Sequence, residues 1–184
     1  MKTLEQNTWI VLIRGINVGG KRIVPMKDLR EKLTHAGYGN VRTYIQSGNV
    51  VFDADETDKT AICLGVADCI NDGFGFTPKI MALATDTMAR IIKGNPYPVA
   101  EGTPKLLHIS FLAEPALNAD IVTLNGVKTD TERFHITNDA VYVYYPEGIG
   151  KSKLASRLEK CLGVLVTTRN WRSANKILEL ATND

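Results

Sequence analysis

Residues 10–26 read Ile-Val-Leu-Ile-Arg-Gly-Ile-Asn-Val-Gly-Gly-Lys-Arg-Ile-Val-Pro-Met, and they set the order strand, loop, helix from which the rest of the fold follows. The run before Arg14 is apolar at consecutive positions and rich in β-branched residues, which is typical of a strand covered on both faces. Pro25 suits the first position of a helix, where its missing N–H group costs nothing. We therefore predict a central strand over residues 8–14 and a helix that begins at Pro25.

The loop between these two elements combines glycine with positive charge. Gly15, Gly19 and Gly20 would let backbone N–H groups approach a ligand closely, while Arg14 and Lys21 would attract an anion. The stretch 15–21 also matches the first seven positions of a P-loop, G-x-x-x-x-G-K. The eighth position is an arginine where a P-loop requires the Ser or Thr that holds magnesium, so a P-loop nucleotidase is not expected. The alternative for this loop is that its glycines only turn the chain.

Strand and helix patterns continue outward from this loop. After the first helix, two short β-rich segments flank Ser47-Gly48-Asn49, which is typical of a hairpin turn. A helical stripe of apolar residues then ends at Gly73. The expected elements are a strand at 8–14, a helix from Pro25 to Gly37, strands at 41–46 and 50–53, a helix ending at Gly73, and a strand at 77–83. This β-α-β-β-α-β order predicts a ferredoxin-like antiparallel sheet with two helices on one face.

The fold class expected for the whole chain is α+β with two subdomains. Residues 1–84 form the ferredoxin-like subdomain, and residues 85–184 form a second α+β subdomain with C-terminal helices. Asn95-Pro96-Tyr97-Pro98 cannot be helical and reads as an extended connector between the two. The second half carries a strand at 105–113, a hairpin over 133–145 and two final helices. No internal sequence repeat is seen.

A second glycine-rich basic loop lies between a strand and a helix at residues 146–153. It contains G-K-S, but Tyr145 stands where a P-loop needs its first glycine. What remains is capture of an anion by backbone N–H groups, Lys151, Ser152 and the N-terminus of the next helix. Arg169 lies near the start of the last helix, where a cation opposes the helix dipole, so we expect a carboxylate or a bound anion to compensate it, a carboxylate being favoured.

Composition narrows the classes of protein to consider. The net charge of +2 does not require nucleic acid, although residues 151–184 carry seven Lys and Arg against three Asp and Glu. The three cysteines and three histidines show no metal-ligand spacing, so no metal site is predicted and the thiols are expected to be reduced. Without a signal pattern or an apolar run of membrane-spanning length, we expect a cytoplasmic protein with no membrane partner.

Several of these stretches together resemble a bacterial family catalogued as domain of unknown function 1697. The matching stretches are LIRGINVGGK (12–21), VPM (24–26), YIQSGNV (44–50), NPY (95–97), GIGKSKL (148–154) and TTRNW (167–171). The resemblance implies a two-part α+β protein with a ferredoxin-like subdomain. It implies no activity, cofactor or catalytic residue, because the family has none assigned.

The leading hypothesis is a protein that binds an anionic, phosphate-bearing small molecule or nucleotide through the two Gly-Lys loops. If the subdomains face each other, the site would gather Arg14, Asn17, Gly19, Gly20, Lys21, Gln46, Asn49, Lys151, Ser152 and Arg169. Gln46 and Asn49 could read a base or sugar, or could simply satisfy the turn that they flank. The identity of the ligand, any cofactor and the oligomeric state are left open.

Three alternatives remain. The protein could be an enzyme, such as a group transferase, acting on that ligand; Asp28, Asp53 and His108 are the candidate general bases, and none has a partner that the sequence identifies. It could be a protein-interaction module that pairs through its sheet. A nucleic acid would meet the same basic loops but is not favoured, since no aromatic-rich RNA-binding strand is present.

Overall fold

The computed structural model describes residues 7–183, and its backbone contacts divide the chain into two compact units. Unit 1 runs to Arg90 and resumes at Lys176, whereas unit 2 is Ile91–Asn175. The chain passes between the units within helices α3 (Thr85–Lys93) and α6 (Trp171–Thr182). The division therefore falls six residues after the boundary expected at residue 84, and the last nine residues belong to unit 1.

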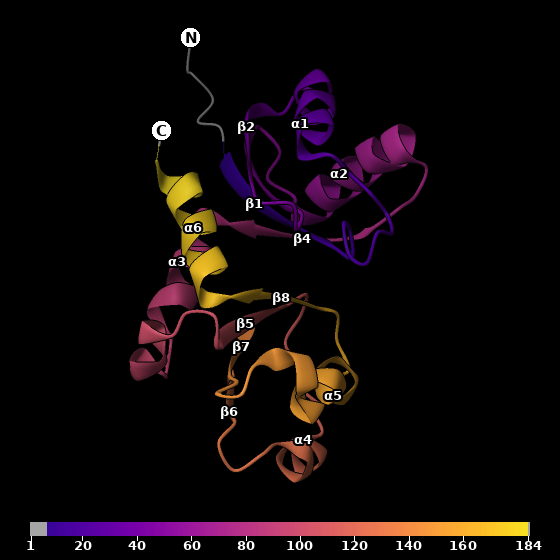
Figure 1. The fold of residues 1–184 in the computed structure, drawn as a ribbon. Helices are drawn as coiled ribbons and strands as arrows, with labels where there is room; N and C mark the ends of the chain where they lie inside the picture. The colour runs from indigo at the N-terminus through magenta and orange to yellow at the C-terminus, as the bar shows by residue number, and fades with distance from the viewer. Residues whose placement is uncertain (1–6, 184) are drawn as a thin grey trace. The chain divides into compact units, whose positions relative to one another are not determined.

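Unit 1 has the ferredoxin-like order predicted from the sequence (Figure 1). Its elements are β1 (Asn7–Arg14), α1 (Met26–His35), β2 (Gly39–Tyr44), β3 (Asn49–Ala54), α2 (Lys59–Phe74) and β4 (Lys79–Ala84). All strand pairs are antiparallel and the strand order is β2-β3-β1-β4. The prediction of fold class is confirmed.

The central strand β1 is buried on both faces, as its continuous apolar run predicts. Val11 and Ile13 join the core beneath α1 and α2, while Ile10 and Leu12 on the opposite face are equally buried. Two helix boundaries differ from the prediction. Pro25 is the N-cap of α1, which begins at Met26, and α2 passes through Gly73 and is ended by a left-handed glycine two residues later. A side chain at Gly73 would meet the flexible end of the Lys32 side chain, which would have to move aside.

Unit 2 repeats the topology of unit 1. Its elements are β5 (Leu107–Leu112), α4 (Ile121–Val127), β6 (Arg133–Ile136), β7 (Ala140–Tyr144), α5 (Lys153–Leu162) and β8 (Val166–Asn170), with 3-10 turns at Pro98–Gly102 and Ile149–Lys151. Its strand order, β6-β7-β5-β8, matches that of unit 1 position for position. In both units a helix, α3 or α6, begins directly after the last strand. The second half is thus a second ferredoxin-like unit.

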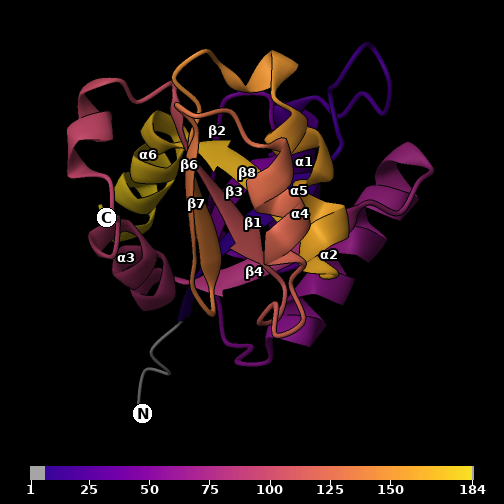
Figure 2. The ribbon, with the colours of Figure 1, turned by 90° about the horizontal axis from the view of Figure 1, so that it is seen from below.

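Helices α4 and α5 lie side by side on one face of the second sheet (Figures 1 and 2). Leu154 and Leu158 of α5 pack with Val141 and Val143 of β7 in one apolar cluster. This packing places the N-terminus of α5, and the loop before it, beside the end of β7. Within residues 7–183, no helix has both the length and the apolar character that crossing a bilayer requires.

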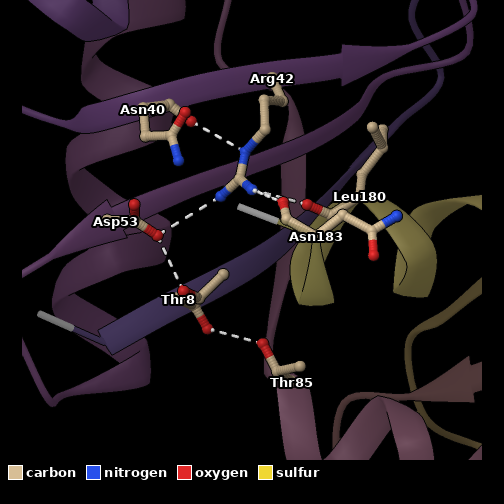
Figure 3. Close-up of polar contacts among 7 residues, drawn as sticks. All are labelled: Thr8, Asn40, Arg42, Asp53, Thr85, Leu180 and Asn183. Carbon is tan, nitrogen blue, oxygen red and sulfur yellow. Dashed lines mark hydrogen bonds and ion pairs between the residues drawn. The ribbon is translucent and has the colours of Figure 1, made fainter.

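The last turn of α6 is attached to the sheet of unit 1 by Arg42 of β2 (Figure 3). Its Nη1 group donates hydrogen bonds to the carbonyl oxygens of Leu180 and Asn183, at 2.7 and 3.1 Å. Its Nη2 group pairs with Asp53 at 3.4 Å, and Asp53 in turn accepts from the Thr8 hydroxyl. The guanidinium therefore binds carbonyls that have no partner within the helix.

Candidate functional site

The first Gly-Lys loop is a short hairpin, visible as the indigo loop at the upper right of Figure 2. The N–H of Lys21 donates to the carbonyl of Val18 at 3.1 Å, and the N–H of Asn17 donates to the carbonyl of Arg22 at 3.2 Å. Gly19 and Gly20 both have positive φ, as a type I′ turn requires. These glycines therefore form a tight turn, and we call residues 15–24 the arm.

The base of the arm is tied to the turn between β2 and β3. The side-chain amide of Asn17 donates to the carbonyls of Val24 and Gln46, at 2.9 and 2.8 Å, and its oxygen accepts from the N–H of Val24. Asn49 is buried and donates to the carbonyl of Tyr44 and the hydroxyl of Ser47. Both asparagines, predicted to bind a ligand, have structural hydrogen bonds here.

The arm and the neighbouring β2–β3 turn expose both basic and apolar side chains. Lys21 and Gln46 are exposed, and the Arg22 guanidinium lies 5.6 Å from the centre of the Phe76 ring. Arg14 is half-buried at the end of β1. The large apolar side chains exposed on the arm and the neighbouring turn are Val18, Ile23 and Ile45.

The second Gly-Lys loop leads into the N-terminus of α5. Gly148 has φ +86°, and its N–H donates to the carbonyl of Tyr145. Ser152 is the N-cap: its Oγ accepts from the N–H of Ala155 at 3.0 Å. The Ser152 hydroxyl therefore stabilises the helix, as N-cap side chains do.

A cavity of about 280 Å³ opens beside this loop within unit 2. It is lined by Val127, Thr129, Glu132, Glu147, Gly148, Lys151, Ser152 and Lys153. Lys151 and Lys153 are exposed, whereas Glu132 is buried, and its Oε2 atom accepts from the N–H of Thr129 at 2.9 Å. The cavity thus combines two lysines and a helix N-terminus with two carboxylates.

Arg169 lies in β8 opposite Ile109. Its neighbour Thr168 shares a hydrogen bond of 2.7 Å with Ser110, and strand alternation puts Arg169 on the other face of the sheet. Burial lowers the pKa of Arg169 to about 10, which still leaves the guanidinium charged at neutral pH. Its Nη1 group donates to the carbonyl of Thr168. It is not among the residues that line the cavity.

Comparison with known proteins agrees with the fold and adds no activity. Residues 6–142 match the model of a family described as a protein of unknown function, DUF1697. The chain belongs to this family. Among solved structures it is similar to the conserved bacterial protein SP0830 from Streptococcus pneumoniae, with a TM-score of 0.67 and 21% identity over 97% of this chain and 99% of that one. No match was found among curated proteins.

The DUF1697 match includes the arm and the β2–β3 turn, and it ends before the second Gly-Lys loop. The two loops also occupy different places in the shared topology: the arm follows the first strand of unit 1, and the second loop follows the third strand of unit 2. Their convergence on a single site stays a prediction.

The candidate general bases are not among the residues that line the cavity. Asp53 pairs with Arg42, Asp28 is exposed on α1, and His108 is buried on β5. Glu132 and Thr129, which line the cavity, were not predicted. Their stretch, Thr-Asp-Thr-Glu-Arg, reads as an exposed polar turn, and its local pattern carries no sign of burial.

Proposed function

We propose that this protein binds a small phosphate- or carboxylate-bearing molecule in the cavity at the start of α5. The observation that supports the proposal is the cavity of about 280 Å³ that is lined by Lys151, Lys153 and the N-cap residue Ser152. This volume is just below the range typical of drug-sized ligands, so a small metabolite suits it better than a nucleotide.

The electrostatics at the start of α5 favour an anion. The first backbone N–H groups of a helix have no partner within the helix and carry its positive dipole end. Lys151 and Lys153 add two positive charges at the same point. Among the residues that the structure describes, neither lysine forms an ion pair within 4.0 Å with Glu132 or Glu147. Their charges therefore remain available to a ligand.

The test is isothermal titration of the full chain with inorganic phosphate, ethyl phosphate and a panel of small phosphates and carboxylates. Thermal unfolding gives a second measurement. A ligand at about a hundred times its dissociation constant stabilises the fold by about 2.7 kcal/mol, so the midpoint temperature of unfolding should rise by about 5–10 °C. We expect Lys151→Ala to weaken binding about tenfold. Lys160→Ala, at the other end of α5, is the matched control and should bind as the wild type does.

Two results would reject the proposal: no compound in the panel binds, or Lys151→Ala binds as tightly as the wild type. Titration of Lys21→Ala tests separately whether the arm contributes to ligand binding. Weaker binding in that variant would support the wider prediction that both Gly-Lys loops serve one ligand. Unchanged binding would restrict the site to the cavity.

Contact with another macromolecule is a second candidate, and it is favoured by the exposed Val18, Ile23 and Ile45. Asn17 links the arm to the turn that carries Ile45, so the apolar groups occur at one edge of unit 1 beside Lys21 and Arg22. Light scattering tests self-association: a dimer that Ile23→Asp disrupts would support this candidate, and a monomer at all concentrations would count against contact with a second copy.

A further inference from the structure

The cavity at the start of α5 contains a carboxylate oxygen that the protein does not satisfy. Glu132 is only 5% exposed, and its Oε2 atom accepts from the N–H of Thr129. Its Oε1 atom has no hydrogen-bond partner among residues 7–183. Every fully inaccessible side-chain nitrogen or oxygen in that range does have a partner, so Oε1 is reached by solvent, and Glu132 lines the cavity.

A largely buried carboxylate is costly unless donors surround it, because it has lost most of its hydration. The strongest partner for it is a positively charged donor. The lysines of the cavity do not supply that partner, since neither lies within 4.0 Å of the Glu132 carboxylate. The cavity therefore presents separate negative and positive groups.

A metal ion is the less suitable partner for this oxygen. Among the described residues, no group of three or more His, Cys, Asp or Glu side chains gathers as metal ligands, here or elsewhere. Calcium takes six to eight oxygen ligands, more than the two carboxylates supply. Lys151 and Lys153 line the same cavity, and their positive charges disfavour any divalent cation there. An ammonium group needs only acceptors, which Glu132 and Glu147 provide.

We infer that the ligand of this cavity is zwitterionic, of the class of amino acids and aminoalkyl phosphates. Its ammonium group donates to Oε1 of Glu132, and its phosphate or carboxylate lies against Lys151 and the first turn of α5. The inference rests on the proposed anion-binding function and adds the charge of the other end of the ligand.

The test uses two probes that share a phosphate and differ in one group. Phosphoethanolamine carries an ammonium group, and ethyl phosphate does not. Titration of the wild-type chain should give about tenfold tighter binding of phosphoethanolamine, the size expected for one charge-assisted hydrogen bond. In Glu132→Gln the ratio should fall close to one, while ethyl phosphate binds at least as well as before. Glu114→Gln, an exposed carboxylate outside the cavity, is the control and should keep the wild-type ratio.

The outcomes separate the two proposals. Equal binding of both probes to the wild type, with loss in Lys151→Ala, would overturn the zwitterion inference and leave the anion-binding function standing. Binding of neither probe would overturn both. A preference for phosphoethanolamine that persists in Glu132→Gln would overturn the role of Glu132. The glutamine in Glu132→Gln retains an oxygen that can accept from the Thr129 N–H, and circular dichroism will show whether the variant folds. If it does not fold, the ratio of the two affinities in the wild type alone decides whether an ammonium group is recognised.

Discussion

Gly48 lies directly against Ile13, where the β2–β3 turn meets the end of β1. The N–H of Ile13 donates to the carbonyl of Gly48 at 2.7 Å, outside the regular pairing of the strands. A Cβ atom on Gly48 would lie 2.8 Å from the carbonyl oxygen of Ile13 and 2.9 Å from its Cβ. Gly48 also has φ +74°. Both the backbone conformation and the contact distance therefore require glycine.

We predict that Gly48→Ala lowers the free energy of unfolding by about 3 kcal/mol, measured by urea denaturation. Gly20→Ala is the matched control, because Gly20 has φ +72° but nothing within 4 Å of an added Cβ. It should cost about 1 kcal/mol for the left-handed backbone alone. Equal losses in the two variants would contradict the close approach of Gly48 to Ile13.

Arg42 holds the end of α6 by donating to several acceptors at once. A positive charge alone is not sufficient for this arrangement, because the donors must also point in the right directions. Lysine keeps the charge but lacks the planar fork that serves Leu180, Asn183 and Asp53 together. We predict that Arg42→Lys lowers the free energy of unfolding by about 1–2 kcal/mol. Amide hydrogen exchange of residues 178–183 should become faster. Arg157→Lys, on the exposed side of α5, should change neither measurement.

Tyr142 is buried in unit 2, and its hydroxyl donates to the carbonyl of Ile91 at 2.6 Å. That carbonyl also accepts from the N–H of Gly94, so it keeps one partner when the hydroxyl is removed. We predict a loss of about 1 kcal/mol in Tyr142→Phe. Tyr144→Phe, two residues along the same strand and half-buried, should lose less than about 0.5 kcal/mol. A larger loss at Tyr144 would contradict this assignment.

Local patterns predict most of the helices and strands, because the spacing of apolar residues depends only on neighbours in sequence. The strand at 8–14 and the hairpin over 133–145 are examples. The local spacing of apolar residues does not show that unit 2 repeats the topology of unit 1. This topology depends on pairings such as His108 with Asn170, which are distant in sequence. The return of α6 to unit 1 depends likewise on Arg42.

The same limit applies to the candidate site. Glycine and lysine identify both loops from the sequence, but the partners of Asn17 include Gln46, 29 residues away. Sequence spacing cannot reveal that this amide is engaged by the protein. Glu132 shows the converse case, since its polar neighbours predict exposure while the fold buries it. Ligand-binding residues are therefore best chosen after the long-range contacts are known.

Burial lowers the pKa of His108 below its ordinary value of 6.5, and the approach of Nδ1 to the Leu106 carbonyl, at 3.4 Å, offsets only part of the effect. Between the lowered pKa and 6.5, the unfolded chain binds a proton that the folded protein does not. Protonation then favours the unfolded state, so stability falls as the pH drops below 6.5.

We expect the wild type to lose more stability between pH 7 and pH 5 than His108→Gln, in which this proton-linked contribution is absent. Urea denaturation at several pH values measures the difference. His35→Gln makes the same substitution at an exposed position on α1 and is the control. Parallel curves for the wild type and His108→Gln would mean that the imidazole takes up its proton equally in both states, which its burial on β5 argues against.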